Sequence, residues 1–145
     1  MEKLEIKCAM QIQKPINEVF EAIIIPEKMT NYFIASSTGI MEEGKDLIWK
    51  FPEFPVEVPV KNIEIDINRS ISFVWDKETV VKIILEEQPD KSTLVKVTED
   101  GKPFNEKNLK WAIENTEGWA NFLACLKAYL EYEIQLRKGA FDFMR

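Results

Sequence analysis

The stretch Glu117-Gly118-Trp119-Ala120-Asn121-Phe122-Leu123-Ala124-Cys125-Leu126-Lys127-Ala128-Tyr129-Leu130-Glu131 decides the fold of this chain. Its apolar residues recur about every 3.6 positions, which predicts one face of a long amphipathic helix. We expect the helix to begin near Asn105 or Asn108, because asparagine caps helix N-termini, and to end at Gly139. The chain before it is mostly strand-like, so we predict an α+β fold in which a curved antiparallel sheet wraps this C-terminal helix.

Gly118 stands inside the predicted helix, where glycine is about 1 kcal/mol less favourable than alanine. A glycine in such a place needs a reason. We interpret Gly118 as allowing a strand or the first helices to approach the helix closely, or as allowing the helix to bend.

The N-terminal part of the chain predicts one strand followed by two short helices. Apolar and polar residues alternate from Leu4 to Ile12, the pattern of a half-buried strand. Pro15 then opens a helix that Pro26 closes, and a second short helix follows, up to Tyr32. Met29, Tyr32 and Phe33 are expected to face inward.

From Ser36 to Asp100 the pattern predicts an antiparallel meander, for a total of about six to seven strands. One strand changes phase, because its apolar residues hold even positions up to Val60 and odd positions from Ile63. A β-bulge near Lys61-Asn62 would produce this change.

Length and charge limit the classes of function. The chain has 145 residues and a formal net charge of −6, which fits one domain over residues 1–145 and disfavours nucleic acid as a partner. No apolar run is long enough for membrane insertion and no signal peptide is visible, so a cytoplasmic location is expected.

Catalytic and metal-binding residue types are scarce. The sequence has no histidine and two cysteines, Cys8 and Cys125, which we interpret as buried free thiols. We therefore expect no metal and no cofactor, and we assign no catalytic residue, which favours a binding protein over an enzyme.

Several motifs together resemble the START-like, or SRPBCC, superfamily with its helix-grip fold. The run Lys14-Pro15-Ile16-Asn17-Glu18-Val19-Phe20 is similar to its first helix, and Pro26-Glu27 with Tyr32-Phe33 to its second. Glu117-Gly118-Trp119 and the leucines after it are similar to its long helix. Within the superfamily the chain most resembles the bacterial branch similar to the activator of the heat-shock protein 90 ATPase.

The resemblance implies a cavity between the sheet and the long helix, and related domains bind lipids, hormones or polyketides there. The candidate cavity-lining residues are aromatic and are expected on inward faces: Tyr32, Trp49, Phe51, Phe73, Trp75, Trp111, Trp119 and Phe122. Large aromatic residues can equally fill a core, so pocket and packed interior both remain open.

Three functions are therefore considered. The first is binding of a small hydrophobic or amphipathic molecule in the cavity. The second is contact with a chaperone or another protein, which the resemblance to the ATPase activator implies. The third is a cofactor-free cyclase or dehydratase that uses Tyr32 or a buried carboxylate. It ranks last, because histidine is absent and no pair of carboxylates has the spacing of a hydrolase.

Overall fold

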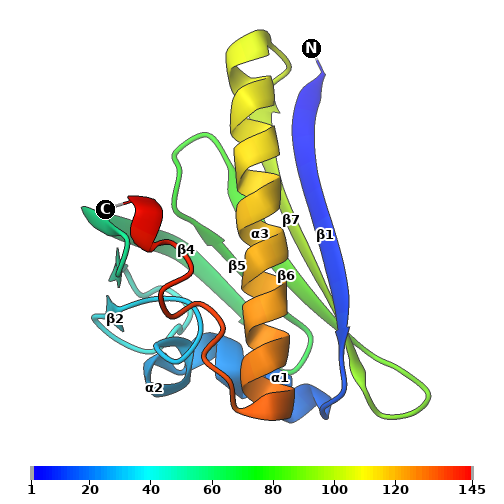
Figure 1. Ribbon diagram of the computed structural model, residues 1–145. Helices are drawn as coiled ribbons and strands as arrows, with labels where there is room; N and C mark the ends of the chain where they lie inside the picture. The colour runs from blue at the N-terminus through cyan, green and yellow to red at the C-terminus, as the bar shows by residue number, and fades with distance from the viewer. Residues whose placement is uncertain (1, 145) are drawn as a thin grey trace.

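A computed structural model describes residues 2–144 of the chain, and it has the predicted architecture (Figure 1). Seven antiparallel strands form a curved sheet in the order β1-β7-β6-β5-β4-β3-β2. A long helix, α3, lies against the concave face of the sheet. The strands are β1 (Lys3–Ile12), β2 (Ser36–Ser37), β3 (Leu47–Phe51), β4 (Phe54–Asp66), β5 (Ser70–Val74), β6 (Val80–Glu87) and β7 (Thr93–Pro103). The helices are α1 (Ile16–Ile24), α2 (Pro26–Met29), α3 (Glu106–Tyr132) and the 3-10 turn η1 (Asp142–Met144).

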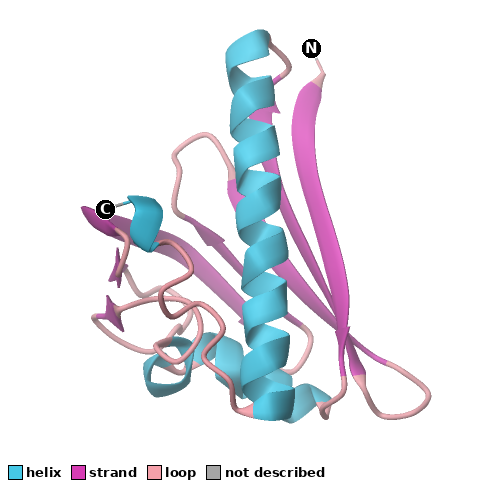
Figure 2. Cartoon of the chain, in the orientation of Figure 1, coloured by secondary structure: helices cyan, strands magenta, loops and turns pink. Residues whose placement is uncertain are grey.

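The core lies between the sheet and α3, with α1 and α2 covering one end (Figure 2). Helix α3 buries Trp119, Phe122 and Leu126 against the sheet, and it contacts β1 and β7 most closely. Met29 and Tyr32 face inward as predicted, each 1% exposed. Among residues 2–144, no helix combines the length and the apolar character that crossing a bilayer requires.

The predicted bulge in β4 is confirmed. The pairing of β4 with β5 slips between Lys61 and Glu64, and Asn62 between them has a φ of 54°. The slip lets Val60 and Ile63 both point inward, although their positions differ in parity, and they are 0% and 2% exposed.

The start of α3 is as predicted, with Asn105 as its N-cap. The Asn105 side chain accepts a hydrogen bond from the backbone N–H of Asn108 at 2.8 Å. The predicted end at Gly139 is wrong, because α3 ends at Tyr132. Glu133 takes the left-handed conformation, with a φ of 54°, and so closes the helix without a glycine.

The chain after α3 folds back over the molecule, and we call residues 133–144 the tail. In Figure 1 it runs from the lower end of α3, past α2, to the tip of β4. Ile134, which a helix running to Gly139 would have included, lies in the tail and is 53% exposed. Gly139 serves a turn of the tail, with a φ of 76°.

The interpretation of Gly118 as a close-packing residue is wrong. Gly118 is exposed, and a β-carbon built on it meets no atom within 4 Å. No neighbouring element therefore requires glycine at this position.

Gly118→Ala is expected to raise the free energy of unfolding by about 1 kcal/mol, because alanine loses less backbone entropy than glycine in a helix interior. Urea unfolding followed by circular dichroism measures the change. Gly101→Ala is the control of opposite sign, since Gly101 has a φ of 133° and its new β-carbon would lie 2.1 Å from the Glu78 carbonyl oxygen. A lower free energy of unfolding for Gly118→Ala would show that a neighbouring element does require glycine at this position.

Candidate functional site

Aromatic rings fill the centre of the space between the sheet and α3. We define the aromatic cluster as Phe33, Trp49, Phe73, Trp75, Trp119 and Phe122. Phe33 and Phe122 contact edge to face with centroids 4.8 Å apart, as do Trp49 and Phe73 at 5.3 Å, whereas Trp75 and Trp119 stack at 5.1 Å. Trp49, Phe73, Trp119 and Phe122 are each at most 2% exposed. Most of the candidate residues are thus brought together, and in this structure they pack against one another.

A buried carboxylate lies at the edge of the aromatic cluster. Glu99 of β7 is 0% exposed, and donors from two sides bind its oxygens. Its Oε2 accepts from Trp75 Nε1 at 2.9 Å and from Thr79 Oγ1 at 2.7 Å. Its Oε1 accepts from Trp119 Nε1 at 2.9 Å and from Asn115 Nδ2 at 3.5 Å. The carboxylate of β7 therefore joins the β5–β6 loop to α3 by charge-assisted hydrogen bonds.

The alternation along β7 predicts that Glu99 faces inward, although it is a charged residue. Inward-facing residues of β7 hold odd positions, and Thr93, Val95 and Val97 are all 0% exposed. The same period of two places Glu99 on the inward face. Charged residues on strands usually face solvent, and Glu99 does not.

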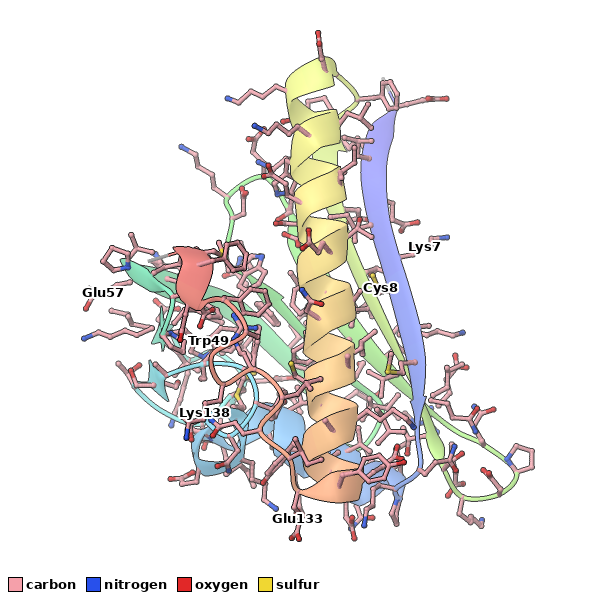
Figure 3. The ribbon with its side chains drawn as sticks, in the orientation of Figure 1. Lys7, Cys8, Trp49, Glu57, Glu133 and Lys138 are labelled. Atoms are coloured by element: carbon pink, nitrogen blue, oxygen red, sulfur yellow. The ribbon has the colours of Figure 1, made fainter. Side chains whose placement is uncertain are left out.

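Trp49 differs from Trp75 and Trp119, the other two indoles of the aromatic cluster. Its Nε1 is buried and has no hydrogen-bond partner among the residues that the structure describes. Figure 3 shows Trp49 on the side of α3 that the tail crosses. An unpaired buried donor costs about 1–3 kcal/mol, so Trp49 contributes by ring packing alone.

A pocket of about 150 Å³ lies beside the aromatic cluster, beneath the tail. We call it the tail pocket. Three segments form its wall: the chain after α2 (Thr30, Tyr32, Phe33, Ile34), the β3–β4 turn (Pro52, Glu53) and the tail (Gln135, Arg137, Lys138, Gly139, Phe141, Asp142). Tyr32 is the cavity-lining candidate that lies on this wall. In Figure 3, Glu133 marks the start of the tail and Lys138 its passage over α2.

The phenol of Tyr32 is unsuited to acid–base chemistry. Its OH donates to the Ala22 carbonyl oxygen at 2.9 Å. Burial, with Tyr129 nearby, raises the pKa of Tyr32 well above its usual range. The group therefore stays protonated at neutral pH, which weakens the case for an enzyme that uses Tyr32 as a base.

A buried ion pair holds the tail against the β3–β4 turn. Arg137 Nη2 donates to Glu53 Oε1, and the two side chains are 13% and 6% exposed. The guanidinium also lies near the rings of Phe33, Phe51 and Phe141, at 5.8, 6.0 and 4.8 Å from their centroids. Arg137 Nε is buried and has no hydrogen-bond partner among the described residues.

The remaining candidates lie at the margins. Phe51 is half-buried and packs edge to face on Phe33 at 5.4 Å. Trp111 is half-buried near the start of α3, with Lys102 Nζ 5.1 Å from its ring centroid. Neither belongs to the wall of the tail pocket.

The two cysteines have the properties of structural thiols. Cys125 is buried and Cys8 is half-buried, and both are free. Burial raises the pKa of both thiols, so they stay protonated and weakly nucleophilic. Within residues 2–144, no three acidic or cysteine side chains gather in a way that could hold a metal ion.

A curved antiparallel sheet that grips one long C-terminal helix defines the START-like, helix-grip class of proteins. Within it, this chain belongs to the family described as activator of Hsp90 ATPase homolog 1-like protein, whose profile matches residues 13–131. No curated protein that was compared matches the chain.

Solved structures agree with this assignment. Protein SSP2350 from Staphylococcus saprophyticus is 33% identical, with a TM-score of 0.82 over 92% of this chain and 96% of that one. The Aha1 dimer of Colwellia psychrerythraea is 17% identical, with a TM-score of 0.74 over 89% and 97%. The AHSA1-like protein from Aeromonas hydrophila is 17% identical, with a TM-score of 0.70 over 90% and 94%. At these lower identities the likeness concerns the fold alone.

Proposed function

We propose that the protein binds a small, mainly apolar molecule in the tail pocket. The observation that carries the proposal is the pocket itself: a space of about 150 Å³ whose lining includes Tyr32, Phe33 and Phe141. An apolar cavity of about that volume in another protein takes up benzene. The ligand, or the part of it that is buried, should therefore have the size of a single ring.

The position of the tail pocket also bears on the cavity expected between the sheet and α3. The aromatic cluster occupies the centre of that space, and the tail pocket lies at its side with Phe33 in common. A ligand in the tail pocket would thus touch the edge of the cluster. We propose this part of the interior, and not its centre, as the binding site.

Titration with toluene, followed by amide chemical shifts, tests the proposal. Shifts are expected at Tyr32, Phe33 and the tail, with a saturable binding curve. Thr30→Phe places a ring on the pocket wall and is expected to abolish binding. Asn31→Phe is the matched control, because Asn31 is the exposed neighbour and does not line the pocket. Absence of saturable shifts in the unmodified protein would refute the proposal.

A contact with a heat-shock ATPase is the second candidate, and one observation favours it. Apolar side chains are exposed at the tip of β4 and at η1: Phe54 is 42%, Val56 54% and Phe143 82% exposed. These two segments lie together in Figure 1, and Arg137 between them approaches the rings of Phe51, at the end of β3, and Phe141, just before η1. Exposed apolar groups of this kind are typical of protein contacts.

The ATPase rate of the host's own heat-shock protein 90 tests this candidate. Addition of the protein should raise the rate, and the double variant Phe54→Ser/Phe143→Ser should raise it less. The double variant Ile67→Ser/Ile113→Ser is a control, since both side chains are exposed but lie on the β4–β5 turn and on α3. An unchanged rate with the unmodified protein would exclude the activity.

A further inference from the structure

We propose that the outer edge of β1 binds a second copy of this chain, so that the two β1 strands pair antiparallel about a two-fold axis. β1 is the last strand of the sheet: β7 lies on one side of it and, within residues 2–144, no strand lies on the other. In Figure 1 this edge and the tail lie on opposite sides of α3. The inference is therefore independent of the tail pocket and of what that pocket binds.

The C-terminal end of the edge shows which backbone groups point toward it. The Gln11 carbonyl oxygen accepts a hydrogen bond from Lys127 Nζ of α3 at 2.9 Å. The Gln13 N–H, just after β1, donates to Glu131 Oε2 of α3 at 2.8 Å. Backbone groups of alternate residues point to opposite edges of a strand. The odd-numbered residues of β1 therefore face the outer edge, and the even-numbered ones face β7.

Three odd-numbered residues nearer the N-terminus leave this edge open. Among the described residues, none outside β7 forms a hydrogen bond to the backbone of Glu5, Lys7 or Ala9. Their side chains are exposed, with 73% exposure for Lys7 and 42% for Glu5, and Figure 3 shows Lys7 directed away from α3. A row of unpaired N–H and C=O groups at a sheet edge is a template for pairing with another strand.

The charges of β1 complement a second copy of β1 in one register. When Glu5 of one copy lies opposite Lys7 of the other, the two-fold axis also places Lys7 opposite Glu5, and Lys3 opposite Ala9 at each end. All of these pairs join odd-numbered residues, so their open backbone groups meet. A shift of two residues brings Glu5 opposite Glu5, or Lys7 opposite Lys7. Like charges in directly opposite positions are destabilising, so the charges favour the first register.

An exposed apolar stripe of α3 borders the same edge. Leu109 is 42% and Ile113 66% exposed, and Ala120 is exposed as well. These residues recur at helical spacing with Lys127 and Glu131, which lie on the side of α3 that bonds to the edge of β1. A second copy that adds its β1 here would remove the stripe from water, which stabilises the association.

The stripe also lies at the height of the proposed two-fold axis. Cys8 Sγ donates to the Thr116 carbonyl oxygen at 3.6 Å, and α3 runs in the same direction as β1 (Figure 1). Ile113, about one turn before Thr116, therefore lies near the level of Ile6. In the proposed register Ile6 is opposite Ile6 of the second copy, so the centre of the stripe and the centre of the strand pair coincide.

Reversal of the charges distinguishes this register from other modes of association. Lys7→Glu creates two Glu–Glu pairs across the axis, and Glu5→Lys creates two Lys–Lys pairs. Each variant alone should dimerise about tenfold more weakly than the unmodified protein. An equimolar mixture of the two variants restores both attractive pairs in a mixed dimer, so it should regain the original affinity. Lys82→Glu is the matched control, because Lys82 is exposed on β6, inside the sheet, and should leave the dissociation constant unchanged.

Ala9→Pro tests the backbone pairing. It removes an N–H that faces the outer edge and keeps the ladder with β7, a place where proline is tolerated, so dimerisation should be lost with an unchanged circular dichroism spectrum. Sedimentation velocity measures association in every case. An unmodified protein that stays monomeric up to about 1 mM would overturn the inference. So would a dimer that both charge reversals leave intact, or a mixture that associates no better than its components. The two charge reversals decide the matter even if Ala9→Pro does not fold.

Discussion

Glu99→Gln is expected to lower the free energy of unfolding by about 3 kcal/mol, although it changes one atom of a side chain. The Glu99 carboxylate accepts from Trp75 on one oxygen and from Trp119 on the other, both at 2.9 Å. A glutamine amide has one oxygen and one NH2 group. Whichever way it is turned, its NH2 opposes an indole N–H that cannot rotate to become an acceptor.

Urea unfolding followed by tryptophan fluorescence measures this loss. Asp100→Asn is the control, because Asp100 is the next residue of β7 and is exposed. It makes the same chemical change on the outer face, where water replaces the lost contacts, and should alter stability by less than about 0.5 kcal/mol. A Glu99→Gln protein as stable as the unmodified one would show that the carboxylate does not organise the two indoles.

Trp119→Phe is expected to cost about 2 kcal/mol more than Trp49→Phe. The two indoles are almost equally buried, at 2% and 1% exposed, so the loss of ring volume is similar. Trp119 donates to Glu99, and its removal leaves that buried oxygen with Asn115 at 3.5 Å. Trp49 Nε1 has no partner among the described residues, so phenylalanine at this position removes an unsatisfied donor.

Calorimetric or urea unfolding of the two single variants and the double variant Trp119→Phe/Glu99→Gln provides the measurement. The double variant should be less destabilised than the sum of its singles, because each single change already breaks the same hydrogen bond. Equal losses for Trp119→Phe and Trp49→Phe would contradict the assigned role of the indole N–H groups.

The fold was predictable because it depends on periodicity. Alternation along β1, the phase change at Lys61-Asn62 and the apolar stripe of α3 are properties of neighbouring residues, and each was confirmed. The prediction of where α3 ends was wrong, and the reason is also local. Glu133 adopts a left-handed conformation that glycine usually adopts, and the Ile134 N–H bonds to the Ala128 carbonyl oxygen at 3.2 Å to complete the cap.

The site was less predictable because it depends on contacts between distant residues. The aromatic candidates were found because alternation along the strands and the helical period place them on inward faces. That pattern does not say whether the rings fill the interior or leave a cavity. The pair Glu53 and Arg137 is separated by 84 positions, and neither residue belongs to a motif. The alternation of inward and outward residues along β7 was sufficient to predict that Glu99 faces inward. It was not among the candidates, because a charged residue on a strand usually faces solvent.

The tail has a consequence for how selectivity is distributed along the chain. Half of the residues that line the tail pocket come from the tail, and this part lies beyond residues 13–131, which match the family. Under the proposed function, a substitution at Phe141 would change what the pocket accepts, and one at Arg137 would also break the contacts with Glu53 and Phe51 at the edge of the sheet. A comparison of the C-terminal segments of relatives would therefore be more informative about the proposed binding than overall identity.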